Sequence, residues 1–224
     1  MHIGFIMDGN RRWAKNNMLK SLDGHKRGLG QFETIVQDCI DRDVQFASFW
    51  ALAKKNILER SEEELNYLYK LIEEMIEHFR VKAHEKDLRF AWIGNQKILP
   101  ESIVRLVNDC QEETKNHQGM TVIVAIGYGG QDEIVEWVKS CLEQGIDPTT
   151  LDEAWFLKLL PSGKLPPPDL IIRTGGTMRT SGYWLYGSEY SEWYFSDKYW
   201  PEFDAQELDK ALEQFSGTIR NFGK

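Results

Sequence analysis

The residues best suited to chemistry stand together near the start of the chain: Asp8, Gly9, Asn10, Arg11 and Arg12. Guanidinium groups and free backbone amides at the start of a helix bind phosphate oxygens. A carboxylate beside them can share a divalent cation with those oxygens. The cluster therefore indicates a diphosphate and cation site, although an Asp-Gly pair is also ordinary turn chemistry.

A second group of polar residues follows the apolar run DLIIRT (169–174). This run ends at Arg173, and a glycine-containing loop then presents Arg179 and Ser181. Two arginines flanking flexible backbone suit bidentate binding of phosphate oxygens. A solvated loop with incidental arginines remains the alternative.

A third polar segment, AKKNILERS (53–61), is expected to be a loop after the apolar run that ends in FWAL. It carries Lys54, Lys55, Asn56 and Arg60, which surface charge alone would also explain. Because all three segments follow apolar runs, they predict one basic site for a diphosphate and a cation at one edge of a sheet.

Apolar residues are plentiful next to this polar edge. The segment after Ser61 has Leu, Ile, Met and Phe at helical spacing, and the run at 46–52 is rich in Phe and Trp. Such stripes usually form core, but they would also suit the tail of a lipid diphosphate.

The elements that must position these residues alternate along the chain. The strand-like runs are 2–7, 44–52, 88–94, 120–127, 169–174 and 192–196. Helices are expected at 24–42, 100–117, 130–144, 151–160 and 204–220, and after Ser61, where a capping box begins. The pattern predicts one α/β domain over 1–224. We expect a mainly parallel sheet of about six strands, helices on both faces and an apolar tunnel.

The amino-acid composition further narrows the class of protein. The net charge of −8 gives the protein no general attraction to nucleic acid, which argues against such a partner. Any phosphate site must then be built from a few local arginines. The three cysteines are far apart and form no CxxC pair, which disfavours disulfides and zinc. No run is long enough to span a bilayer and no signal peptide is evident, so we expect a cytoplasmic protein.

The motifs resemble those of the cis-prenyltransferase family, which includes the undecaprenyl diphosphate synthases. The similarity covers nearly the whole chain, and its anchors are IMDGNRRWAK (6–15), GHKRG (24–28), the Asn56 to Arg60 segment, YGG (128–130), DLIIRTGG (169–176), RTSGYWL (179–185), YSEWYFSDKYWPEF (190–203) and FG (222–223). The resemblance implies condensation of isopentenyl diphosphate with an allylic diphosphate of the geranyl or farnesyl class. It also implies Mg²⁺, a homodimer and a Z-polyprenyl diphosphate product, with peripheral membrane contact to release a long product.

The resemblance also implies roles for individual residues. Asp8 and Glu192 would bind the metal, Asp8 would assist departure of the pyrophosphate, and Asn56 would orient a reacting group. The allylic diphosphate positions are Gly9, Asn10, Arg11, Arg12 and His25, with Trp13 completing the motif and Arg60 as a further substrate-binding residue. Arg173, Arg179 and Ser181 match the isopentenyl diphosphate site.

Some positions depart from the family pattern. Ala53, Lys55 and Ile57 replace a hydroxyl, a carboxylate and an indole in the 53–61 segment, while Ser21 and Asn221 replace arginines. Two alternatives to a catalytic cis-prenyltransferase remain. One is a non-catalytic partner subunit of a heteromeric enzyme. The other is an aspartyl phosphatase, which the asparagine at position 10 disfavours.

Overall fold

The computed structural model describes residues 1–218, which are built on one six-stranded sheet with the order β3-β4-β2-β1-β5-β6. Every neighbouring pair is parallel. The strands are β1 (His2–Ile6), β2 (Phe46–Ala53), β3 (Arg89–Ile93), β4 (Thr121–Tyr128), β5 (Leu170–Arg173) and β6 (Glu192–Phe195). The predicted parallel sheet is confirmed, and each strand lies within two residues of its predicted bounds.

Helices connect the strands, as the alternating pattern predicts. They are α1 (Asn10–Asn16), α2 (Ser21–Ile40), α3 (Lys54–Glu59), α4 (Glu62–Glu85), α5 (Glu101–Thr114), α6 (Gly130–Glu143), α7 (Glu153–Leu159) and α8 (Ala205–Gly217), with single 3-10 turns η1 (Gln96–Ile98), η2 (Pro148–Thr150), η3 (Ser162–Lys164) and η4 (Trp200–Glu202). The expected extension of the last helix to 220, and Asn221 with the FG pair, lie outside the described residues.

The 53–61 segment is mostly helix α3, so the prediction of a loop is wrong there. Nothing in KKNILE breaks a helix, and the Lys55–Glu59 ion pair at 3.6 Å supports the turn. At the next helix, Ser61 Oγ accepts a hydrogen bond from the backbone N–H of Glu64 at 3.3 Å. The serine half of the predicted capping box is thus confirmed, whereas the Glu64 carboxylate turns to Arg60 instead.

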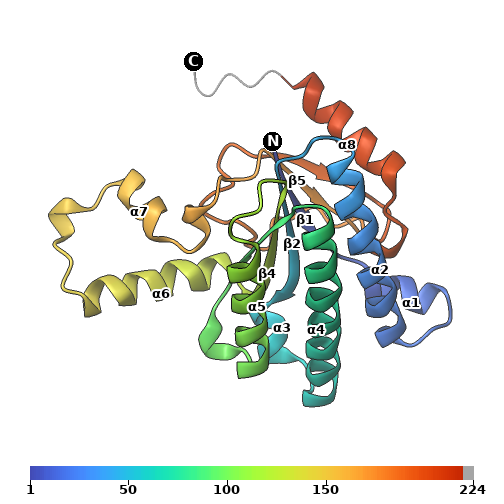
Figure 1. The fold of residues 1–224 in the computed structure, drawn as a ribbon, viewed down its shortest axis with the longest axis horizontal. Coiled ribbons are helices and arrows are strands. Elements are labelled where there is room, and N and C mark those ends of the chain that lie inside the picture. The colour runs from blue at the N-terminus through green and yellow to red at the C-terminus, as the bar shows by residue number, and fades with distance from the viewer. Residues whose placement is uncertain (219–224) are drawn as a thin grey trace.

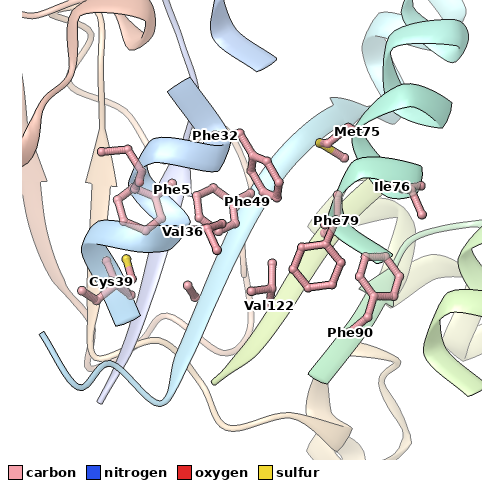
Figure 2. Close-up of a cluster of buried hydrophobic side chains, with 14 of the residues drawn as sticks. Phe5, Phe32, Val36, Cys39, Phe49, Met75, Ile76, Phe79, Phe90 and Val122 are labelled. Carbon is pink, nitrogen blue, oxygen red and sulfur yellow. The ribbon is translucent and has the colours of Figure 1, made fainter. Parts of the chain in front are cut away.

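The two faces of the sheet are covered differently. The larger core cluster packs α2, α4, α5 and α8 against one face (Figure 1). Figure 2 shows part of this layer, with Phe32 and Phe49 beside the α4 side chains Met75 and Phe79. On the other face, a smaller cluster is capped by Tyr183 and Trp184 from the non-helical segment 177–190.

Helices α6 and α7 extend away from the sheet to the left in Figure 1. They pack on each other through a third small cluster of Trp137, Cys141 and Leu160. Within residues 1–218, no helix is both long and apolar enough to cross a membrane.

Candidate active site

The carboxyl ends of the strands open into a cleft of about 1650 Å³. Because all strands run the same way, segments that follow β1, β2, β4 and β5 meet there. The cleft is lined by most of the predicted site residues, namely Asp8, Gly9, Asn10, Arg11, Arg12, His25, Asn56, Arg60, Arg173, Arg179 and Ser181. The predicted convergence of three polar segments at one edge is therefore confirmed.

Asp8 lies at the centre of this edge between two guanidinium groups. Its Oδ2 accepts from Arg173 Nη2 at 2.9 Å, and its Oδ1 is 3.1 Å from Arg12 Nη2. The side chain of Arg173 is only 5% exposed, while that of Asp8 is 31% exposed. The Asp8 carboxylate is thus partly exposed to the cleft, while the buried Arg173 holds its Oδ2.

The backbone around Asp8 is fixed as firmly as its side chain. Its carbonyl accepts from Thr174 Oγ1 at 2.7 Å and from the Trp200 N–H at 3.0 Å. Gly9 follows with φ of 105° as the N-cap of α1, and a Cβ there would lie 2.6 Å from the ring of Tyr199. This left-handed turn therefore requires glycine, and it aims the start of α1 at the cleft.

Helices α1 and α2 approach closely because two glycines face the contact. A Cβ on Gly24 would lie 2.1 Å from the Asn10 carbonyl oxygen, and one on Gly28 would lie 2.4 Å from Asn10 Oδ1. The GHKRG motif is thus a packing motif, and it also brings His25 to the cleft beside Arg11 and Arg60.

His25 is neutral at physiological pH, because burial and the nearby Arg60 and Arg11 lower its pKa to about 4. Arg60 Nη1 donates to His25 Nε2 at 3.4 Å and to Glu64 Oε1 at 2.6 Å. Since Nε2 accepts, the proton of the neutral ring belongs on Nδ1, which leaves a donor for a ligand. Burial lowers the pKa of Arg60 from its usual value.

Arg173 also organises the loop after β5. Its Nη1 donates to the Arg179 carbonyl at 2.6 Å and to Ser181 Oγ at 2.7 Å. Ser181 has φ of 53°, an unusual conformation for a residue with a side chain. Arg173 Nε is buried without a hydrogen-bond partner among the described residues.

Two predicted site residues do not line the cleft. Trp13 is half-buried on α1 and is outside the cleft lining. Glu192 is at the first position of β6, in register with Leu170 at the start of β5, whereas Arg173 pairs with Phe195 at the other end. Glu192 and Asp8 are thus separated by more than ~10 Å along the strands. Within one chain, the structure therefore does not bring Glu192 and Asp8 together, and the metal role of Glu192 stays a prediction.

The donor set suits a cation that is held mainly by its substrate. In residues 1–218, no group of three or more His, Cys, Asp or Glu side chains is placed to hold a metal ion. Mg²⁺ commonly binds through one or two carboxylates, with phosphate oxygens and water completing its shell. Asp8, exposed at the edge of a basic cleft, fits that pattern.

Sequence reasoning missed several residues that position the site. Glu64 holds Arg60, Thr174 holds the Asp8 carbonyl, and Lys54 is paired with Asp132 across the cleft. The i,i+4 spacing of Arg60 and Glu64 was a usable signal. The other contacts join segments far apart in sequence, for which the sequence carries no local signal.

The residues that line the cleft form two groups, which we call its two branches. The helical branch, between α2, β2 and α4, is apolar and is lined by Leu29, Phe32, Leu52, Leu68, Leu71, Ile72 and Met75. The loop branch is lined by Trp50, Tyr128, Gly130, Asp132, Val135, Thr180, Ser181, Gly182 and Leu185. Asp8 and the arginines lie where the two branches meet. A ligand with a diphosphate head and an apolar tail therefore fits this arrangement.

Comparison with known proteins identifies the family of the chain. Residues 6–223 match the family model described as "Putative undecaprenyl diphosphate synthase". An isoprenyl transferase of Aquifex aeolicus is 36% identical over 223 residues, covering all of this chain and 95% of the relative. A geranylgeranyl-diphosphate-specific tritrans,polycis-undecaprenyl-diphosphate synthase of Thermoplasma acidophilum is 36% identical over 229 residues, covering 100% of this chain and 88% of the relative.

Solved structures give the same picture. Lavandulyl diphosphate synthase from Lavandula x intermedia, in complex with dimethylallyl diphosphate, superposes with a TM-score of 0.93 at 30% identity, covering 100% of this chain and 98% of that one. A probable undecaprenyl diphosphate synthase from Campylobacter jejuni gives 0.81 at 25% identity with the same coverage. The fold is that of solved prenyl diphosphate synthases. The chain belongs to the undecaprenyl diphosphate synthase family of cis-prenyltransferases, whose members use isopentenyl diphosphate and an allylic diphosphate.

Proposed function

We propose that this protein is a Mg²⁺-dependent cis-prenyltransferase that condenses isopentenyl diphosphate with an allylic diphosphate of the geranyl or farnesyl class. The product is a Z-polyprenyl diphosphate, and pyrophosphate is released. The observation that carries the proposal is the placement of Asp8 between Arg12 and Arg173, at the point where an apolar branch meets a basic cleft.

The allylic diphosphate binds at the start of α1. Backbone amides after Gly9, the side chains of Arg11 and Arg12, and the neutral His25 supply donors to its oxygens, while Arg60 adds a charge held in place by Glu64. Its apolar tail enters the helical branch, whose buried side chains exclude water. Isopentenyl diphosphate binds at Arg173, Arg179 and Ser181 on the opposite side of Asp8.

The reaction breaks the allylic C1–O bond and forms a new carbon–carbon bond from the isopentenyl double bond. The arginines stabilise negative charge on the departing pyrophosphate, and the apolar wall protects the cationic carbon from water. Mg²⁺ bound by Asp8 and phosphate oxygens would neutralise further charge on the leaving group. Asn56 orients a reacting group, because an amide is too weak a base to take the proton itself. The proton that restores the double bond goes to pyrophosphate.

A homodimer is part of the proposal. Helix α6 projects from the sheet and exposes Val138 and Leu142 one turn apart, which is an apolar face that a second copy would cover. Light scattering of the purified chain tests the dimer. Vesicle flotation with and without product tests peripheral membrane contact for product release.

The first experiment compares the wild-type chain with Asp8→Asn in a radiolabelled isopentenyl diphosphate assay. We expect product from the wild type only when Mg²⁺ is present, and a loss of kcat of about 10³-fold in the variant. Asp109→Asn, an exposed position on α5, is the matched control. Full activity of Asp8→Asn would remove the basis of the proposal. An inactive wild type that activates a second chain would show a partner subunit instead.

The high structural similarity to a lavandulyl diphosphate synthase favours a second candidate, in which dimethylallyl diphosphate is one of the substrates. Ala53 ends β2, and Lys55 and Ile57 lie on α3. Ala53 and Lys55 line the cleft, where they would affect which five-carbon diphosphate is accepted. Assays with dimethylallyl diphosphate alone, and with isopentenyl diphosphate added, distinguish the two candidates by product mass.

A further inference from the structure

Trp50, near the end of β2, is an aromatic side chain in the wall of the loop branch. Its ring stacks on the ring of Tyr183, with centroids 5.1 Å apart and an angle of 12° between the planes. Because Tyr183 is fully buried, it covers one face of the indole and holds the ring in place. Trp50 is therefore a fixed part of the cleft wall.

The outer face of the Trp50 indole is the ring surface left for the cleft. The Tyr128 ring centroid is 6.1 Å from both rings of the stack, so it lies beside the stack and does not cover that face. Trp50 Nε1 is buried and has no hydrogen-bond partner among the described residues, so the nitrogen edge does not reach the cleft. The π-face of an indole attracts a cation.

The sheet places Trp50 beside the proposed isopentenyl diphosphate site. Arg173 pairs with Ile6 of β1, and Phe5 pairs with Phe49 of β2. Trp50 follows Phe49, so it lies at the level of Arg173, on the same face of the sheet and two strands or ~10 Å away. In isopentenyl diphosphate, four bonds of roughly 1.5 Å separate C3 from the nearer phosphorus, which spans ~5 Å. A diphosphate held by Arg173 therefore places C3 within reach of the indole.

We propose that the outer face of Trp50 stabilises the cation that forms on the isopentenyl group during condensation. The electron pair of the C3–C4 double bond forms the new bond from C4 to C1 of the allylic group, while the pair of the allylic C1–O bond leaves with pyrophosphate. C3 is then a tertiary cation until a proton on C2 moves to pyrophosphate and the C2–C3 double bond forms. The proposal rests on the proposed function, because it assigns a further catalytic residue to the same reaction.

Fluorinated tryptophans at position 50 give the main test. Fluorine withdraws charge from the π-face and weakens cation binding with little change in ring size. The 5-fluoro, 5,7-difluoro and 5,6,7-trifluoro forms are compared with the wild type in single turnovers with radiolabelled isopentenyl diphosphate. We expect the rate of condensation to fall about twofold with each fluorine, because the cation forms only after the substrate has bound. Rates that stay constant across the series would overturn the proposal.

Trp92 is the matched control, because it is also half-buried but lies on β3, outside the cleft lining. The same fluorinated forms at position 92 should leave the rate unchanged. Trp50→Phe should slow condensation about threefold and Trp50→Leu about thirtyfold, with the KM for isopentenyl diphosphate changed less than about twofold. If the KM rises more than the rate falls in folded Trp50→Phe, Trp50 acts in substrate binding and the proposal is wrong.

A binding measurement separates this proposal from the proposed function. 2-(Dimethylammonio)ethyl diphosphate carries a positive nitrogen in place of C3, whereas 3-methylbutyl diphosphate has a similar shape without that charge. We expect the wild type to bind the charged analogue about tenfold more tightly, and the trifluoro form of Trp50 to lose most of this preference. No turnover together with this loss would overturn the proposed function alone. Turnover with a preference that the trifluoro form keeps would overturn the role of Trp50 alone.

Discussion

The two branches of the cleft are built by different means. Regular helices wall the helical branch, and its shape depends on which apolar side chains stand at successive turns of α4. The loop branch depends on segment 177–190, whose backbone includes the positive φ values of Ser181, Gly182 and Trp184. Side-chain packing thus shapes one branch, while hydrogen bonds from Arg173 shape the other.

This contrast predicts separable effects. A change in the helical branch should alter product length and the KM for the allylic diphosphate, and leave the KM for isopentenyl diphosphate nearly unchanged. A change in the hydrogen bonds of the loop branch should alter the KM for isopentenyl diphosphate and leave length unchanged. The measurements below test this division, from the largest expected effect to the smallest.

The largest effect on substrate binding is expected for Arg173→Lys. Lysine keeps the charge but lacks the planar fork that holds Asp8, the Arg179 carbonyl and Ser181 together. We expect KM for isopentenyl diphosphate to rise about 10²-fold, corresponding to about 2.7 kcal/mol, with product length unchanged. The exposed Arg105→Lys is the control. A shift in product length without a change in KM would contradict the division between the branches.

A second effect concerns the attachment of segment 177–190 to the sheet. Buried His2 donates from Nδ1 to the Pro166 carbonyl at 2.7 Å and lies 2.8 Å from Ser48 Oγ, which also accepts from Trp184 Nε1 at 3.2 Å. Desolvation by burial lowers the pKa of His2 to about 4, so this histidine is neutral in the folded protein.

Between pH 6.5 and 4, the unfolded chain therefore binds a proton at His2 that the folded protein does not. Stability must fall as pH falls through this window, by up to about 3 kcal/mol from this one group. Chemical denaturation at several pH values measures the loss, and His2→Gln should reduce it. Amide exchange should increase first in 177–190. Earlier exchange in α4 would contradict our assignment of this sensitivity to the loop branch.

The smallest effect tests the close contact of α1 with α2. Gly24→Ala places a methyl group against the Asn10 carbonyl and should destabilise the protein by about 2 kcal/mol. Gly30→Ala is the matched control on the same helix, where nothing lies within 4 Å of the added carbon. Because alanine favours helix, this control should stabilise by about 0.5–1 kcal/mol. If the two variants were equally stable to heat, α1 would have moved to accommodate the added methyl group without cost.

The same contrast explains what could be predicted from sequence. Buried strands and amphipathic helices show their hydrophobic pattern along their whole length. The bounds of these elements could therefore be predicted to within a few residues. Asp8 and Arg173 could be predicted because each directly follows or ends such a strand. The helix at Lys54 was missed because its six residues are too few to show a period, and it is held by contacts from other segments.

Glu192 shows the limit of motif matching. Its motif is adjacent to an apolar run, as the other site motifs are, but Glu192 begins its strand whereas Arg173 ends one. Which end of a strand a residue occupies depends on where the hydrogen bonding between strands begins. The sequence around EWYF carries no clear signal for that starting point. Side-chain partners such as Thr174 with Asp8 require the paired strands themselves and could not be predicted.

The ion pair between Asp8 and Arg173 joins positions that are 165 residues apart. On the ribosome, the carboxylate emerges long before its guanidinium partner, and β1 lacks one of its two neighbouring strands until β5 has been made. No nascent chain shorter than 173 residues contains both members of this ion pair. Truncations ending before residue 169 should therefore show no affinity for pyrophosphate.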